Sequence, residues 1–196
     1  MKSLKDYICE SMFDEEDIET NVADAEIIDW IVKNYKQINT SHLKISKKPN
    51  KDGKYVVDYK YNVQPKDSSI VSLTNGMFVW GEVEGDFNCS YCTSLTSLAG
   101  APEKVGGDFY CLNCTTLTSL KGAPKIVKKN FYCVDCNSLT SLEGAPKEVG
   151  RNFNCNSCRN LTSLDGISKK VGGNIYCHGC AKNLLAEEDI KKAKKS

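Results

Sequence analysis

The sequence has no excess charge of either sign and no long apolar run. Its 26 lysine and arginine residues nearly balance 25 aspartate and glutamate residues, so the net charge of +1 disfavours nucleic acid as the partner. No segment approaches the roughly 18 apolar residues of a membrane span, and the first residues hold no stretch resembling a signal peptide. The sequence therefore predicts a cytoplasmic protein without a membrane partner.

Histidine is also scarce, because His42 and His178 are the only two in the chain. Neither stands in a recognisable catalytic spacing with a serine or a carboxylate. An enzyme is therefore not expected. The enzymatic alternative is a thiol-dependent effector that uses Cys9, in a non-repeating region that is small for such a purpose.

Cysteine, by contrast, is abundant, with 11 residues. Ten of them form five Cys-x-x-Cys pairs at a constant spacing of 22 residues, which begin at Cys89, Cys111, Cys133, Cys155 and Cys177. Their partners are Cys92, Cys114, Cys136, Cys158 and Cys180. Since thiols stay reduced in the cytoplasm, the count does not predict a disulfide scaffold.

Other residues recur with the same period. The apolar columns are Val83, Val105, Val127, Val149 and Val171; Phe87, Phe109, Phe131, Phe153 and Ile175; Leu95, Leu117, Leu139 and Leu161; and Leu98, Leu120, Leu142 and Leu164. Such a period indicates one structural unit per repeat, stacked so that neighbouring units bury each other's apolar edges.

A unit such as Val105-x3-Phe109-x-Cys111-x2-Cys114-x2-Leu117-x2-Leu120 resembles a leucine-rich repeat. The Leu-Thr-Ser-Leu-x-Gly-Ala-Pro stretches at 95–102, 117–124 and 139–146 resemble short repeats of bacterial and bacteriophage proteins. The resemblance covers roughly residues 70–184. It implies a leucine-rich-repeat solenoid with a parallel β-sheet and few or no convex helices. It also implies a phage-encoded protein that acts on a host protein in the bacterial cytoplasm.

Three regions are expected along the chain. Residues 1–66 form an α+β N-terminal cap, with helices near 3–12 and at 21–38 and a hairpin of strands 43–45 and 55–63. Residues 67–184 form a solenoid of about five turns. Residues 185–196 form a short capping helix with a basic tail, whose charge favours a helix C-terminus.

Two interpretations of the cysteines remain open. Cys89, Cys92, Cys111 and Cys114 could form a zinc tetrathiolate site, because the 18 residues between Cys92 and Cys111 fit a zinc ribbon. However, five pairs leave one pair over, and every cysteine shares a register with apolar columns. Stacked strands also lie only ~4.8 Å apart, which leaves little room for an ion. We therefore favour a buried thiol ladder without a cofactor, with zinc as the alternative.

Strand alternation predicts the binding face. If the phenylalanine and the first cysteine of each repeat point inward, their neighbours point outward. The resulting protein-binding candidates are Tyr110, Leu112, Tyr132, Val134, Asn154, Asn156, Tyr176 and His178, with an aspartate and asparagine column as a polar rim. Cross-strand packing alone would also explain tyrosine and valine there. Lysines such as Lys104, Lys128 and Lys170 are expected on loops opposite the strand.

Overall fold

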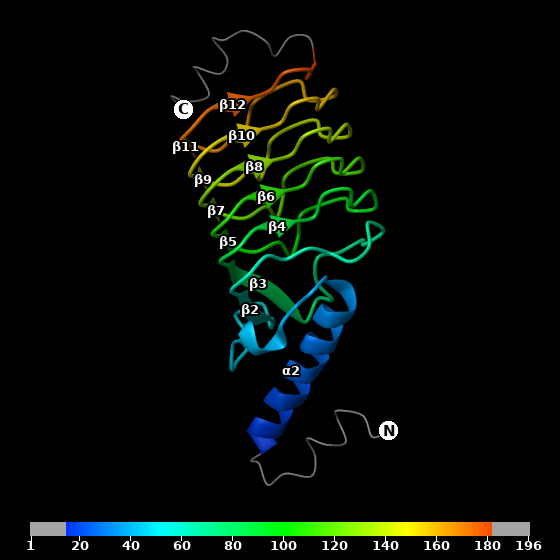
Figure 1. The fold of residues 1–196 in the computed structure, drawn as a ribbon, viewed down its shortest axis with the longest axis vertical. Coiled ribbons are helices and arrows are strands. Elements are labelled where there is room, and N and C mark those ends of the chain that lie inside the picture. Colours follow the sequence, from blue (N-terminus) through cyan, green and yellow to red (C-terminus); the bar gives the residue numbers. More distant parts are fainter. Residues whose placement is uncertain (1–14, 182–196) are drawn as a thin grey trace.

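Each 22-residue repeat forms one turn of a coil, and the turns stack along the long axis of the molecule (Figure 1). The structure is a computed structural model and describes residues 15–181. The predicted helices at 3–12 and 185–196 lie outside the described residues. The parallel-strand solenoid with little helix, expected from the repeats, is confirmed.

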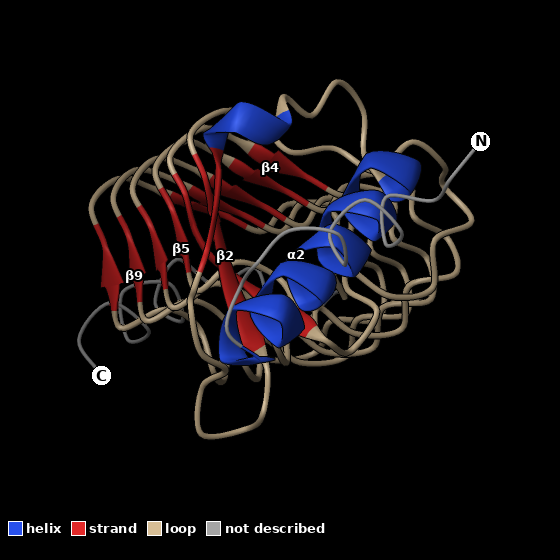
Figure 2. Cartoon of the chain, turned by 90° about the horizontal axis from the view of Figure 1, so that it is seen from below, coloured by secondary structure: helices blue, strands red, loops and turns tan. Residues whose placement is uncertain are grey.

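Two sheets form neighbouring walls of the coil (Figure 2). The five-stranded sheet, in the order β12-β10-β8-β6-β4, carries the phenylalanine column. Its strands are β4 (Phe87–Asn88), β6 (Phe109–Tyr110), β8 (Phe131–Tyr132), β10 (Phe153–Asn154) and β12 (Ile175–Tyr176). All of them pair in parallel with residues 22 positions apart aligned, as Phe109 is with Phe131.

The valine column forms a second strand in each turn, which the sequence did not reveal. The seven-stranded sheet has the order β1-β2-β3-β5-β7-β9-β11. Its strands are β1 (Leu43–Ile45), β2 (Tyr55–Tyr59), β3 (Phe78–Val83), β5 (Lys104–Val105), β7 (Ile126–Val127), β9 (Glu148–Val149) and β11 (Lys170–Val171). Lys104 and Lys170 therefore lie in strands, and placing them on loops was wrong. A two-residue strand is too short to show an alternating pattern.

The apolar columns fill the coil. Phe87, Phe109, Phe131 and Phe153 are fully buried, and their rings stack between turns with centroids 5.1–5.6 Å apart. Both leucine columns and all ten repeat cysteines are buried around them. Burying one such apolar side chain contributes roughly 1.5–3 kcal/mol, so every turn is stabilised mainly by contact with its neighbours.

The N-terminal region extends this core. Helix α2 (Glu15–Asn34) lies across the end of the stack (Figure 2) and buries Ile27 and Ile31. The ring of Tyr35 meets that of Trp80 edge to face at 5.4 Å, and its hydroxyl donates to the carbonyl of Leu73 at 2.7 Å. These contacts tie the end of the helix to the first turns of the coil. No helix among the described residues is long and apolar enough to cross a membrane.

The hairpin is present, with its first strand as expected and its second strand shorter than expected. After the short 3-10 helix η1 (Thr40–His42), strand β1 (Leu43–Ile45) pairs antiparallel with β2 (Tyr55–Tyr59), and β2 pairs in parallel with β3. Strand β2 ends before residue 63 because Val63 bridges to Phe87 in the other sheet. Helix α2 ends at 34 rather than 38, where the Asn34 side chain donates to the carbonyl of Trp30 at 2.7 Å.

Gly122→Ala is expected to destabilise the chain more than Gly53→Ala. Both glycines have a positive φ, of 87° and 71°, which costs any other residue about 1–2 kcal/mol. A Cβ at Gly122 would also lie 2.5 Å from the backbone nitrogen of Ala99, whereas one at Gly53 meets nothing within 4 Å. Overpacking adds roughly 1–3 kcal/mol. Urea unfolding of the two variants measures the difference, and equal losses would contradict close stacking of the turns.

Candidate binding face

The outer surface of the five-stranded sheet brings the predicted residues together. Tyr110, Tyr132, Asn154 and Tyr176 stand in register on adjacent strands, beside the buried phenylalanine column. Leu112, Val134, Asn156 and His178 follow two residues later in the same turns. All eight are half-buried except His178, which is exposed. The side chains therefore form a largely half-buried surface on the outside of the sheet. We call these eight residues the strand face.

Two tyrosines stand on the adjacent strands β6 and β8 of the strand face. The rings of Tyr110 and Tyr132 are parallel, with centroids 5.0 Å apart and planes 3° apart. The Tyr110 hydroxyl donates to Oδ2 of Asp108 at 2.9 Å. Two causes raise the pKa of Tyr110 above its ordinary value. The larger is partial burial of the phenol, and the second is the adjacent Asp108 carboxylate, so the phenol stays protonated. Asn154 separates Tyr176 from this pair, and the Asn174 amide contacts the Tyr176 hydroxyl at 3.2 Å.

The aspartate and asparagine column holds the turns together. Each Oδ1 accepts a hydrogen bond from the backbone N–H one turn later: Asp86 from Asp108 at 2.8 Å, and Asp108 from Asn130 at 2.7 Å. Asn130 and Asn152 continue the series at 3.1 and 2.9 Å. The expected polar rim is therefore a structural ladder that satisfies backbone donors at the corner of the coil. The sequence feature that indicates this ladder is the constant 22-residue spacing of the aspartate and asparagine residues.

The thiols form a second internal ladder. In four of the five pairs, the second cysteine donates to the carbonyl of the first cysteine one turn earlier, as Cys114 does to Cys89 at 3.2 Å and Cys136 to Cys111 at 3.0 Å. In several pairs the first cysteine donates to a backbone carbonyl of the next turn, as the Cys89 thiol does to the carbonyl of Tyr110 at 3.3 Å. Burial raises the pKa of Cys111 and, more strongly, that of Cys133. Protonated donors rather than nucleophilic thiolates therefore suit these positions.

The four cysteines proposed for zinc lie within this ladder. Cys89, Cys111 and Cys114 each donate to a carbonyl of an adjacent turn, and Cys92 contacts the carbonyl of Ser90 at 3.8 Å. Within residues 15–181, no three histidine, cysteine or acidic side chains converge as a metal site requires. The absence of a cofactor stays a prediction, and the enzymatic candidate Cys9 lies outside the described residues.

Left-handed residues inside each Cys-x-x-Cys pair were not foreseen. The residue before the second cysteine has a φ between 54° and 72° in all five turns. These residues are Tyr91, Asn113, Asp135, Ser157 and Gly179. Glycine, asparagine and aspartate are the usual residues in this conformation, whereas tyrosine is rare there. Tyr91 is also 61% exposed, which makes it the most accessible aromatic side chain beside the strand face.

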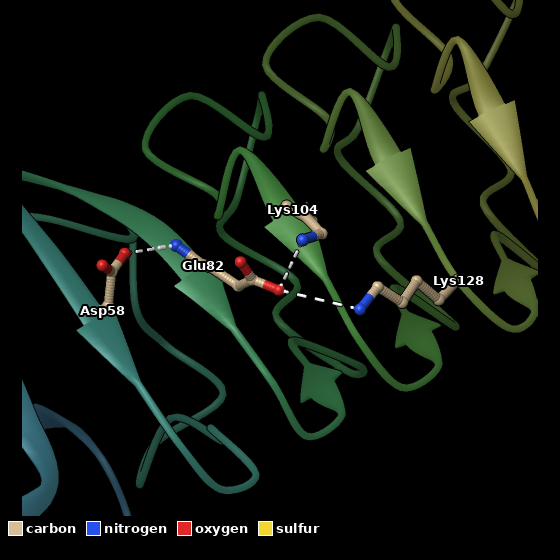
Figure 3. Close-up of polar contacts among 4 residues, drawn as sticks. All are labelled: Asp58, Glu82, Lys104 and Lys128. Carbon is tan, nitrogen blue, oxygen red and sulfur yellow. Dashed lines mark hydrogen bonds and ion pairs between the residues drawn. The ribbon is translucent and has the colours of Figure 1, made fainter.

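Several strands of the seven-stranded sheet carry ion pairs, and Figure 3 shows those of Glu82 on β3. Oε1 of Glu82 lies 2.8 Å from Nζ of Lys104 and 3.9 Å from Nζ of Lys128. The backbone N–H of Glu82 donates to Oδ1 of Asp58 at 2.6 Å. Lys170 pairs with Glu148 at 2.7 Å on a further pair of strands. Such exposed pairs contribute at most about 1 kcal/mol each, so they set local charge more than stability.

Comparison of the chain with models of protein families, with curated proteins and with solved structures finds no match. The class of the protein therefore rests on its own geometry. The described residues define a solenoid of parallel strands with a thiol-lined interior and one sheet face that carries a tyrosine pair.

The chain is expected to lose stability at alkaline pH through its buried thiols. Burial raises the pKa of Cys92 from its ordinary value near 9 to about 12. Since the thiol must stay neutral in the folded chain, its stabilising contribution is complete below about pH 9 and is lost as the pH rises toward 12. Denaturant unfolding at about pH 8 and about pH 11 measures the fall in the free energy of unfolding between the two pH values. This fall should be smaller in Cys92→Ala than in the wild-type chain. An identical loss in both chains would contradict the assignment to Cys92.

Metal analysis of the purified chain is expected to find no stoichiometric zinc. The physical reason is that the thiols of Cys89, Cys111 and Cys114 already donate to backbone carbonyls within a close-packed interior. Elemental analysis and thermal unfolding with and without a chelator are the measurements. Stoichiometric zinc whose removal unfolds the chain would contradict the thiol ladder and establish the zinc alternative.

Proposed function

We propose that the chain is a non-catalytic protein-binding module that uses the strand face. The observation that carries this proposal is the parallel Tyr110–Tyr132 pair, which is half-exposed beside Leu112 and Val134. Tyrosine is enriched in the cores of protein interfaces, because it presents a large rigid surface and a polar tip. A sheet whose strands are held in register also presents these side chains without a large ordering cost.

Packing alone is the competing explanation for the tyrosine pair. Aromatic cross-strand pairs stabilise sheets by about 0.2–1 kcal/mol without any partner. The internal phenylalanine stack already joins the same turns, however, with ring centroids at 5.2 Å between Phe109 and Phe131. The outer pair adds a second aromatic stack on the side that faces solvent, where polar residues would serve the fold equally well.

The resemblance of the repeats to short bacterial and bacteriophage repeats supports a partner among bacterial proteins. In this proposal the chain acts in the bacterial cytoplasm, where its thiols remain reduced. The cysteines serve packing and inter-turn hydrogen bonding, so binding requires no cofactor. The N-terminal helix and hairpin cover the first turn, and catalysis is not part of the proposal.

Tyr132→Ala is expected to weaken partner capture roughly tenfold or more while lowering stability by only about 1 kcal/mol. The immobilised chain is exposed to bacterial lysate, and the retained proteins are compared between wild type and variant. Tyr61→Ala is the matched control, because Tyr61 is 47% exposed and precedes the repeats.

Proteins lost with Tyr132→Ala and kept with Tyr61→Ala identify partners of the strand face. Identical retention by both variants would overturn the proposed function. Thermal unfolding of each variant completes the experiment. Collapse of the fold on Tyr132→Ala would show that this column is part of the core.

A further inference from the structure

Three cations stand out at the corner where the seven-stranded sheet turns into the five-stranded sheet. Two residues occupy this corner in each turn from residue 106 onward: Gly106-Gly107, Lys128-Lys129, Gly150-Arg151 and Gly172-Gly173. A Cβ on Gly106 or Gly150 would overlap the carbonyl oxygen of the preceding turn. Side chains are thus disfavoured at this corner, and those that occur from residue 106 onward are all positively charged, whereas Glu84 occupies the same corner one turn before Gly106.

These cations lack the close acidic partners that other lysines have. Lys104, Lys125 and Lys170 each lie 2.7–2.8 Å from a glutamate oxygen. Lys128 is only 3.9 Å from Glu82, which Lys104 holds more closely (Figure 3). Lys129 and Arg151 are exposed and make no ion pair within residues 15–181.

The fold also holds the cations close to one another. The backbone N–H of Arg151 donates to the carbonyl of Lys129 at 2.9 Å, so the two residues stand in adjacent turns. Neighbouring strands are ~4.8 Å apart, which places like charges side by side. The adjacent column is neutral here, because it consists of Asn130 and Asn152. A local positive potential therefore remains for an anion to neutralise.

This corner is continuous with the tyrosine pair. Lys129 precedes Tyr132 by three residues, so the backbones of the two residues lie no more than about 10 Å apart. The tyrosine pair and the cations thus form one surface of apolar centre and positive edge. The carboxylates of Asp86 and Asp108 belong to the column between this corner and the tyrosine column, and Oδ1 of Asp108 accepts a hydrogen bond from the backbone N–H of Asn130, the residue after Lys129.

We infer that Lys128, Lys129 and Arg151 bind the carboxylates of an acidic polypeptide segment that docks across Tyr110 and Tyr132. This inference rests on the proposed function and specifies the chemistry of the partner. Lysine and arginine pair with carboxylates through charge-assisted hydrogen bonds, and arginine does so with two parallel bonds. Charge pairs at the edge of an interface mainly raise the association rate and select the partner.

A polypeptide fits this surface better than a nucleic acid does. The two tyrosine rings stack on each other at 5.0 Å, so bases could not insert between them without separating the pair. Nucleic acids also require a long basic track, whereas the cations here occupy two turns of a chain with a net charge of +1.

The test measures binding of the full chain to a fluorescent random copolymer of glutamate and tyrosine. Lys129→Glu/Arg151→Glu is expected to weaken binding roughly tenfold or more, and salt is expected to weaken wild-type binding. Lys47→Glu/Lys51→Glu is the control, because it changes the net charge equally on the exposed hairpin loop beyond β1. Strand β1 is four strands away from β7 in the sheet. The control is expected to bind as tightly as wild type.

A mixed-sequence single-stranded oligonucleotide is the competing probe. If it binds as tightly as the copolymer and is lost in the same variant, the partner is a nucleic acid and the inference is overturned. No binding of the copolymer by wild type, or equal loss in the control, also overturns it. If Tyr132→Ala weakens copolymer binding and Lys129→Glu/Arg151→Glu does not, the result supports binding by the strand face. It overturns the inference that the cations bind an acidic partner. If neither variant weakens copolymer binding, the proposed function falls too.

Discussion

The structure depends on parallel backbone hydrogen bonds between turns 22 residues apart. The N–H of Phe109 donates to the carbonyl of Asn130, and that of Cys111 to the carbonyl of Tyr132, both at 2.9 Å. Because this register repeats without a shift from β4 to β12, identical side chains stack directly over one another. A column of one residue type in the sequence thus becomes a line of contacts through the molecule.

That register assigns a different task to each column. Phenylalanine rings stack in the interior, aspartate and asparagine oxygens accept the N–H groups of the next turn, and thiols donate to carbonyls between turns. These three ladders satisfy polar groups within the coil and exclude water from its interior. A column can then depart from the repeat at one turn, as Lys129 does where glycine is usual, without disturbing the rest.

The departures carry the functional hypothesis. Tyr110 and Tyr132 lie on the adjacent strands β6 and β8, and Lys128, Lys129 and Arg151 lie at the corner of neighbouring turns. A regular framework makes such a cluster rigid, because each side chain projects from a backbone fixed by the turns on both sides. The surface therefore combines an apolar centre with one positive edge, which is the pattern of a selective interface.

The sequence by itself determined the solenoid, the parallel pairing of its turns, the inward direction of the phenylalanine and cysteine columns and the residues of the strand face. It did so because a strict period leaves only one register in which apolar residues meet. Only the tertiary structure decided that the valine column forms a second sheet and that Asp108 and Asn130 hold the turns together. It also decided that Lys129 and Arg151 share a corner where neither makes an ion pair with another described residue. The second sheet was hidden because a two-residue strand is too short to show an alternating pattern. The bond between Asp108 and Asn130, 22 residues apart, depends on the backbone geometry at the corner of the coil, which the sequence pattern does not specify.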